Sequence, residues 1–216
     1  MTYATYANLH HIAFHLELPM PAPRRSRAAM SAETTERLIA VARRQFSEKG
    51  FAAVVMDDLC AEADLTRGAL HHHFGGKAGL FTAVVQSLLE NINQLLDERY
   101  ATHDDPWEGY IDTCLYYYDL LHDQALRRIL LQDAPAVLGA RLRELEEASY
   151  IGPMAQGLVE LQEAGRLRSF DAVAMAHLIN GAMGDSGMWV IAQQDPQAAA
   201  ERVKAALRCL LEGLQA

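Results

Sequence analysis

Residues 56–73 read MDDLCAEADLTRGALHHH, and this stretch decides the fold. Its apolar residues recur at the spacing of one face of a short helix, at Met56, Leu59, Cys60 and Ala63. Residues 64–66 then predict a tight turn, and Thr66 is a good N-cap for a second helix that runs to about His73. Because the turn is too short for antiparallel helices, the stretch is typical of a helix-turn-helix.

The second helix of such a unit is the one that enters the major groove of DNA. Its first turn here combines free backbone N–H groups with small side chains, at Thr66, Arg67, Gly68 and Ala69. Such a turn can approach a phosphate or a base edge closely. The sequence therefore predicts double-stranded DNA as a partner.

Helical patterns fill the chain on both sides of this unit. Ser31 is expected to cap a first helix that ends near Gly50, where a left-handed residue would stop it. A start signal, Asp195 followed by Pro196, opens the last helix. The remaining helices are expected over 77–100, 107–121, 123–132, 139–164, 171–193 and 196–214. No alternating strand pattern occurs, so the sequence predicts an all-α protein.

Three parts are expected along the chain. Residues 1–30 form a flexible leader with a basic arm at Arg24, Arg25 and Arg27, and the true start is open among Met1, Met20 and Met30. Residues 31–77 form a three-helix helix-turn-helix domain, and residues 78–216 form a C-terminal helical bundle. Residues 1–77 carry nine Lys/Arg against eight Asp/Glu, whereas residues 78–216 carry ten against twenty. A polyanion is therefore expected to dock on the N-terminal part.

Composition and spacing exclude several classes of protein. The apolar runs span only a few residues, so neither a transmembrane helix nor a membrane partner is expected. Cys60, Cys114 and Cys209 are too few and too far apart for a disulfide framework, which favours a reducing, cytoplasmic location. The histidines at 71–73 would point about 100° apart on a helix, which argues against a metal site. No nucleophile–base pair and no phosphate-binding glycine loop is present, so we expect neither an enzyme nor a cofactor.

Residues 33–84 resemble the DNA-binding domain of the tetracycline-repressor (TetR) family of transcription regulators. The matching residues are Ala42, Phe46, Gly50, Phe51, Leu59, Ala63, Leu65, Thr66, Gly68, Leu70, His72, Phe74, Lys77 and Leu80. The resemblance implies a homodimeric repressor that a small-molecule effector releases from a near-palindromic operator. It also implies DNA contacts from Thr66, Arg67, Gly68, His71, His72 and Lys77, with the arm at Arg24, Arg25 and Arg27 following the backbone or the minor groove. Two alternatives stay open: Gly68 is small only for packing, and Lys77 is only structural.

Three positions depart from the family pattern. Val55 stands where the family usually has Thr or Ser, so the helix that begins at Met56 lacks a side-chain cap. Asp64 replaces the usual turn glycine and places a negative charge near DNA, although Asp tolerates a left-handed backbone. His71 replaces a tyrosine that contacts phosphate. These losses leave open a second hypothesis, a small-molecule-binding helical dimer whose DNA binding is weakened or lost.

The C-terminal bundle is expected to bind the effector and to form the dimer. The last predicted helix carries a continuous apolar stripe, at Val203, Leu207, Leu210, Leu211 and Leu214, which is expected at the dimer interface. Aromatic and polar side chains on partly apolar helices are candidate effector contacts, although packing is the commoner role of such residues. The candidates are Tyr117, Tyr118, His177 and Trp189. Nothing in the sequence names the effector or the operator.

Overall fold

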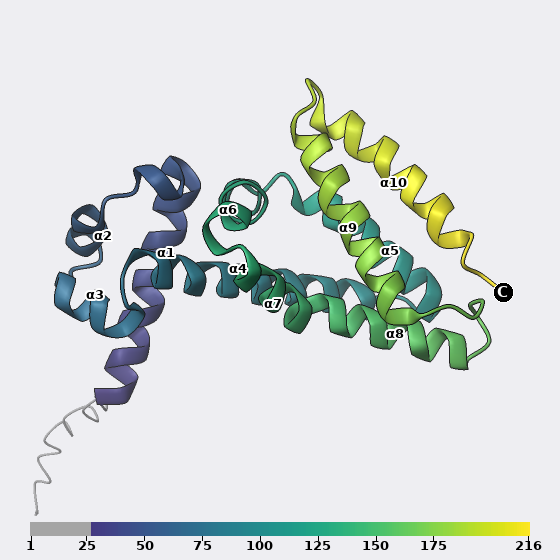
Figure 1. The fold of residues 1–216 in the computed structure, drawn as a ribbon, viewed down its shortest axis with the longest axis horizontal. Helices are drawn as coiled ribbons and strands as arrows, with labels where there is room; N and C mark the ends of the chain where they lie inside the picture. The colour runs from purple at the N-terminus through teal and green to yellow at the C-terminus, as the bar shows by residue number, and fades with distance from the viewer. Residues whose placement is uncertain (1–26) are drawn as a thin grey trace, which may run out of the picture.

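The computed structural model describes residues 27–216, and this part of the chain folds as helices joined by short turns (Figure 1). The elements are α1 (Arg27–Ala53), α2 (Met56–Glu62), α3 (Arg67–Phe74), α4 (Lys77–Tyr100), α5 (Pro106–Leu120), η1 (Leu126–Asp133), α6 (Ala134–Leu138), α7 (Ala140–Glu146), η2 (Glu147–Ile151), α8 (Gly152–Glu163), α9 (Ala172–Ile191) and α10 (Pro196–Glu212), where η marks a π-helical segment. The predicted all-α class is confirmed. Arg24 and Arg25 lie outside the described residues.

The molecule is elongated, with α1 to α3 at one end, α6 and α7 near α4 in the middle, and α5, α8, α9 and α10 at the other end (Figure 1). Helix α4 links the two ends and takes part in both hydrophobic cores. Its first half buries Leu80, Phe81 and Val84 in the smaller core, which also holds residues of α1, α2 and α3. Its second half packs Ile92 and Leu96 against the larger core. One continuous helix therefore connects the helix-turn-helix unit to the C-terminal bundle.

The smaller core is organised around aromatic rings where the end of α1 meets α4. The Phe46 and Phe81 rings meet edge to face with centroids 5.0 Å apart, and the Phe51 and Phe81 centroids are 4.9 Å apart. Such pairs add to the free energy of area burial by roughly 0.5–1.5 kcal/mol each. Ile129 of η1 is also fully buried in this core. The helix-turn-helix unit is thus packed directly against a segment that lies 50 or more residues later in the sequence.

The larger core fills the space between α5, α8, α9 and α10. Its fully or almost fully buried side chains include Trp107, Ile111, Leu158, Ala176 and Leu211. The start signals predicted for α10 are confirmed, because Pro196 is its first residue and Asp195 accepts a hydrogen bond from the Ala198 N–H at 2.9 Å. These helices form the C-terminal bundle, against which the second half of α4 packs.

Two π-helical segments change the expected helix pattern. The helix predicted over 123–132 is π-helical from Leu126 to Asp133, and the one predicted over 139–164 divides into α7, η2 and α8. Each π-helical segment ends two residues before a proline, Pro135 or Pro153. A proline ring clashes with the carbonyl four residues earlier in a regular α-helix, and a wider turn relieves that clash. Hydrophobic periodicity alone does not reveal such a widening.

The first helix also differs from the prediction at both ends. It is already helical at Arg27, the first described residue, so Ser31 lies inside the helix rather than at its cap; Arg, Ala and Met at 27–30 are strong helix formers. At the other end Gly50 has a φ of 78° and a ψ of 161°, so the regular helix breaks at the predicted residue, although its conformation is not αL. Residues 51–53 are helical again beyond the kink. The kink brings Phe51 over the start of α4.

Candidate nucleic-acid interface

The turn between α2 and α3 keeps the helix-turn-helix geometry although it lacks the usual glycine. Asp64 has a φ of 54°, the left-handed backbone expected for a residue at this position. The turn is closed by the Leu65 N–H, which donates to the Cys60 carbonyl at 2.9 Å. Leu59, Ala63 and Leu70 are almost completely buried and fix the angle between the two helices. The aspartate therefore does not disrupt the fold of this unit.

Helix α3 has a well-formed start and end. The Thr66 hydroxyl accepts a hydrogen bond from the Ala69 N–H at 3.2 Å, which confirms Thr66 as the N-cap. Gly75 has a φ of 70° and donates its N–H to the His71 carbonyl at 2.8 Å, a left-handed stop after two turns. Helix α2, by contrast, begins after Val55 with no side-chain cap, as its sequence predicts. Asp57 and Asp58 in its first turn instead stabilise the helix start, because their negative charges lie near the positive end of the helix dipole.

The outer face of α3 is exposed to solvent over its whole length. Its exposed residues are Thr66, Arg67, Gly68, His71, His72 and His73, which include every position on α3 expected to contact DNA. A Cβ atom at Gly68 would meet only the Thr66 hydroxyl, at 3.9 Å. Packing within the chain therefore does not require glycine at position 68, and the interpretation that Gly68 is small for packing is wrong. A small residue here leaves room for a partner instead.

Arg67 and Asp57 form a bidentate ion pair between the first turns of α3 and α2. The Arg67 Nη2 donates to Asp57 Oδ2 at 2.7 Å, and the Arg67 Nε donates to Asp57 Oδ1. The side chains are 66% and 63% exposed, so the pair lies on the surface that the helix-turn-helix unit presents. The sequence predicted a DNA contact for Arg67 but assigned no role to Asp57.

Lys77, expected to bind a phosphate, makes two contacts within the chain. Its Nζ donates to the Ala52 carbonyl at 3.2 Å and lies 4.6 Å from the centroid of the Phe51 ring. Partial burial lowers the pKa of Lys77. An ammonium group has three N–H donors, so the contact with Ala52 leaves two for a phosphate. The structural role and the expected DNA contact of Lys77 are compatible.

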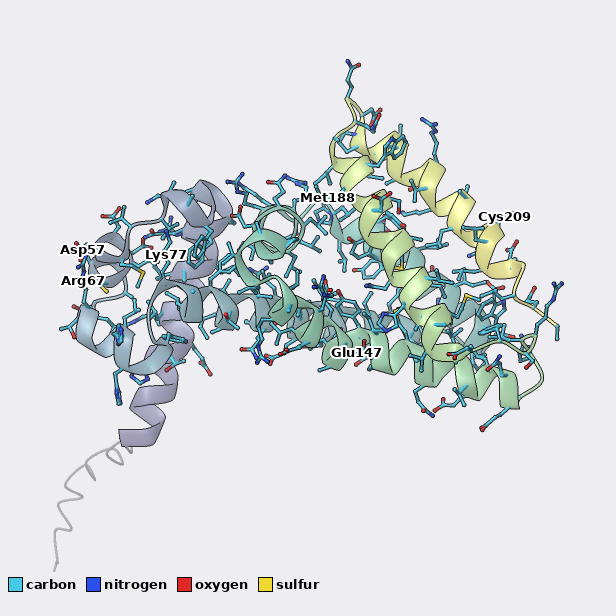
Figure 2. All side chains as sticks on the ribbon, in the orientation of Figure 1. Asp57, Arg67, Lys77, Glu147, Met188 and Cys209 are labelled. Carbon is cyan, nitrogen blue, oxygen red and sulfur yellow. The ribbon has the colours of Figure 1, made fainter. Side chains whose placement is uncertain are left out.

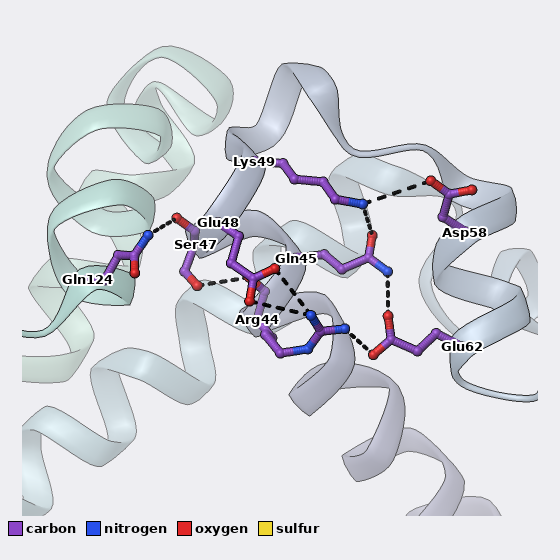
Figure 3. Close-up of polar contacts among 8 residues, drawn as sticks. All are labelled: Arg44, Gln45, Ser47, Glu48, Lys49, Asp58, Glu62 and Gln124. Atoms are coloured by element: carbon purple, nitrogen blue, oxygen red, sulfur yellow. Dashed lines mark hydrogen bonds and ion pairs between the residues drawn. The ribbon is translucent and has the colours of Figure 1, made fainter.

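A polar network fixes α2 to α1 behind the exposed face (Figure 3). Gln45, which is 2% exposed, donates from Nε2 to Glu62 Oε2 at 2.8 Å, and Arg44 pairs with the other oxygen of Glu62. The hydrogen bond from Arg44, followed by that from Gln45, lowers the pKa of Glu62. Lys49 and Asp58 add a wider ion pair of 3.9 Å. These contacts, together with the apolar core, hold the two helices in a fixed relation.

Comparisons with known proteins identify the family. Residues 38–84 match the family model described as bacterial regulatory proteins, tetR family, and residues 107–214, half of the chain, match the tetracyclin repressor-like C-terminal domain. The chain belongs to the TetR family. It is therefore a transcriptional regulator with a DNA-binding helix-turn-helix domain.

Individual relatives match between half and nine-tenths of the chain. The crystal structure of a TetR-family transcriptional regulator from Pectobacterium atrosepticum is 38% identical, with a TM-score of 0.77, covering 88% of this chain and 98% of that one. The transposon Tn10 TetC protein of Escherichia coli is 27% identical over 68% of this chain and 75% of its own length. TtgR of Pseudomonas putida is 38% identical over 53% of this chain and 48% of its own length. The last match spans about half of either protein.

A set of contacts joins the TetR-family DNA-binding unit to η1. The Phe51 N–H donates to Asp133 Oδ2 at 2.7 Å, and Arg128 Nε lies 3.4 Å from the same carboxylate oxygen. Just before η1, Gln124 Nε2 donates a hydrogen bond to the backbone carbonyl of Ser47 at 3.1 Å (Figure 3). These contacts meet the kinked end of α1 beside Lys77. Sequence reasoning assigned no role to Asp133.

The C-terminal domain contains a cleft of about 340 Å³ that brings together two of the four expected effector contacts. The Tyr118 hydroxyl lies 2.7 Å from the Ser186 hydroxyl, and the Trp189 ring lies 5.4 Å from the guanidinium of Arg202. The lining residues are Tyr118, Ala182, Ser186, Trp189, Arg202, Val203, Ala206, Leu207 and Leu210. Tyr117 and His177 do not line it. Tyr117 packs against Gly187, and the exposed His177 lies 3.4 Å from Glu147.

The apolar stripe on α10 divides between the interior and the surface. Leu207 and Leu211 are 5% and 1% exposed because α10 turns them toward its own core, so their expected place at a dimer interface is wrong. Val203 and Leu214 are half-buried, whereas Leu210 is 67% exposed. Other large apolar side chains exposed on the neighbouring helix α9 are Val173, Leu178, Met188 and Trp189. The free apolar surface of α9 and α10 therefore keeps Leu210 of the predicted stripe and adds side chains of α9.

None of the helices in the described part of the chain is both long and apolar enough to cross a membrane.

Three cysteines are present as free thiols, with Cys60 and Cys114 buried and Cys209 exposed. Burial raises the pKa of the Cys114 thiol to about 12. The two buried thiols are thus held protonated, in keeping with a packing role.

Proposed function

We propose that this protein is a repressor that binds a near-palindromic DNA operator as a homodimer and is released by a small-molecule effector. The observation that carries this proposal is the exposed face of α3, which projects Arg67, His71 and His72 from a unit held rigid by α1, α2 and α4. N-terminal residues of such a helix reach base edges, and residues around it position the protein on phosphates. Thr66, Gly68, Lys77 and the arm at residues 24–27 complete the proposed DNA contacts.

A two-fold dimer would present two copies of α3 to successive half-sites. The exposed apolar side chains of α9 and α10, including Leu178 and Leu210 at 67% exposure each, support this dimer. Exposed large apolar residues on adjacent helices are unusual on a monomer's surface and typical of an association face. The cleft at Tyr118 and Trp189 opens on the same helices, so an effector there would act close to the proposed interface.

The main alternative, a ligand-binding dimer that has lost DNA binding, is not favoured. It depended on Val55, Asp64 and His71, yet Asp64 adopts the required left-handed turn and α3 keeps its cap. The match of residues 38–84 to the family's regulatory domain also supports DNA binding.

The test is a binding assay with full-length protein on the DNA upstream of its own gene and on a scrambled duplex of equal length. We expect specific retardation that weakens steeply with salt, because phosphate contacts release counterions. Arg67→Ala is expected to abolish the preference for the upstream DNA. Arg143→Ala, a change of equal charge on an exposed residue of α7, is the matched control and is expected to bind as wild type does. Equal affinity of wild type for both duplexes would contradict the proposal.

A further inference from the structure

The geometry of the Arg67–Asp57 pair restricts how Arg67 can meet DNA. A guanidinium offers two edges for paired hydrogen bonds: a side edge, made of Nε and one terminal nitrogen, and an end edge, made of the two terminal nitrogens. Asp57 occupies the side edge, through Nε and Nη2. Among the described residues, Asp57 is the hydrogen-bond partner of this guanidinium. The end edge, with Nη1 and the second N–H of Nη2, stays open toward solvent.

The open edge matches one base in the major groove. Guanine presents two acceptors there, O6 and N7, and a bidentate arginine is the commonest specific contact with them. Arg67 is the first residue of α3, the part of a recognition helix that contacts base edges. In Figure 2 the pair lies at the far end of the N-terminal unit, away from α9 and α10. The Arg67 side chain is 66% exposed, so its end edge is accessible from solvent.

We propose that Asp57 is a positioning residue that holds the Arg67 guanidinium in place to read one guanine in each operator half-site. An arginine whose side edge is already fixed loses less conformational freedom when its end edge binds. An exposed pair of this kind is weak in water, but it strengthens when DNA displaces the solvent around it. The inference rests on the proposed function, since it assumes that α3 enters the major groove.

Two other roles for Asp57 make different predictions. If Asp57 keeps Arg67 away from DNA, removal of the Asp57 carboxylate increases the discrimination between guanine and other bases. If Asp57 only stabilises the start of α2 through the helix dipole, its removal lowers stability but leaves base preference unchanged. Asp58 provides a matched control for both. It lies in the same first turn and carries the same charge, but its ion pair is with Lys49 at 3.9 Å.

The experiment begins with selection of binding sites from random double-stranded DNA by wild-type, full-length protein. Each guanine of the selected half-site is then replaced in turn, and dissociation constants are measured by fluorescence anisotropy at fixed salt. The readout is the ratio of the dissociation constants of the replaced and original sites for each protein. A reduced folded fraction cancels in this ratio, so a variant that is partly unfolded still gives an answer. The proteins are wild type, Asp57→Asn, Asp58→Asn, Arg67→Ala and the double variant Asp57→Asn/Arg67→Ala.

We expect one guanine whose replacement weakens wild-type binding by about tenfold or more, the discrimination typical of a bidentate contact. Asp57→Asn should reduce this ratio severalfold at that guanine alone, and Asp58→Asn should keep it. In the Arg67→Ala background the ratio should be close to one, and Asp57→Asn should not change it further. Removal of either aspartate also raises affinity for all DNA by lowering repulsion, and that common effect cancels in the ratio.

The inference is overturned if Asp57→Asn keeps or increases the wild-type ratio, or if Asp58→Asn loses as much of it. It is equally overturned if Arg67→Ala alters no guanine preference. In each of these cases wild type still selects an operator, and the proposed function stands. If wild type enriches no sequence at all, the proposed function fails, and the inference fails with it.

Discussion

Replacement of Gly50 by alanine is expected to destabilise the protein through two separate effects. Gly50 combines a φ of 78° with a ψ of 161°, a region of backbone conformation that is open essentially only to glycine. Forcing another residue into it costs about 1–3 kcal/mol. A Cβ at this position would also collide with the guanidinium of Arg128. Arg128 would have to move away from Asp133, which it contacts at 3.4 Å.

The two effects add to a measurable loss of stability. The Phe51 N–H donates to the same Asp133 carboxylate, and disturbing a hydrogen bond to a charged group costs about 1 kcal/mol or more. We therefore expect Gly50→Ala to lower the free energy of unfolding by about 2–4 kcal/mol. For a chain of this size each kcal/mol shifts Tm by about 2–4 °C, which gives a decrease of about 4–16 °C.

The assay is thermal unfolding followed by circular dichroism at a fixed protein concentration, since dimer formation makes Tm depend on concentration. Gly157→Ala is the matched control. Gly157 lies inside α8, and a Cβ there would be 3.7 Å from the Tyr110 ring, an ordinary contact distance. Because alanine is the better helix former, Tm should stay the same or rise slightly. Gly50→Ala/Arg128→Ala removes the collision but keeps the backbone strain. The error of such a scan is about 1 °C. A Gly50→Ala protein whose Tm lies within about that error of the wild-type Tm would refute the reasoning.

Three further predictions concern association and DNA binding. Leu178→Glu/Leu210→Glu should give a folded monomer in light scattering, because both side chains are exposed, and a dimer of unchanged mass would place the interface elsewhere. Lys77→Ala should weaken binding to every DNA sequence and reduce the slope of log affinity against log salt by about 1, and an unchanged slope would remove Lys77 from the phosphate contacts. His71 is exposed on α3 at the position of a phosphate-contacting tyrosine, so His71→Ala should weaken binding to every DNA sequence. Unchanged binding by His71→Ala would remove His71 from the proposed phosphate contacts.

The sequence predicted the helix-turn-helix unit well because its determinants are local. The N-cap at Thr66, the turn at Asp64 and the bounds of α4 each depend on residues within a few positions of one another. Caps, turn residues and apolar spacing act over one helical turn, so they are readable without tertiary contacts. The exposed face of α3 follows from the same pattern, since its buried side, at Leu70, is fixed by the turn.

The errors concern features that depend on distant parts of the chain. A stripe of leucines shows that α10 has an apolar face, but only the packing of α5 and α9 decides that Leu207 and Leu211 face inward while Leu210 does not. The Arg67–Asp57 pair joins residues ten positions apart on two helices, and no periodicity reports such a contact. The kink at Gly50 accommodates Arg128, which lies 78 residues later in the sequence.

The same distant contacts explain how one chain can couple its two ends. Segment η1 buries Ile129 in the smaller core and Leu126 in the larger one, so it cannot move relative to either without disturbing packing in both. Its last residue, Asp133, holds the Phe51 N–H, and the Phe51 ring lies against the Lys77 ammonium at the start of α4. A shift of the C-terminal helices by an effector would therefore reach the DNA-binding unit at two points, through α4 and through η1. An effector can change operator affinity only if it binds one arrangement of these contacts more tightly than the other. Segment η1 thus places Ile129 and Asp133 of the C-terminal part of the chain in direct contact with the DNA-binding unit.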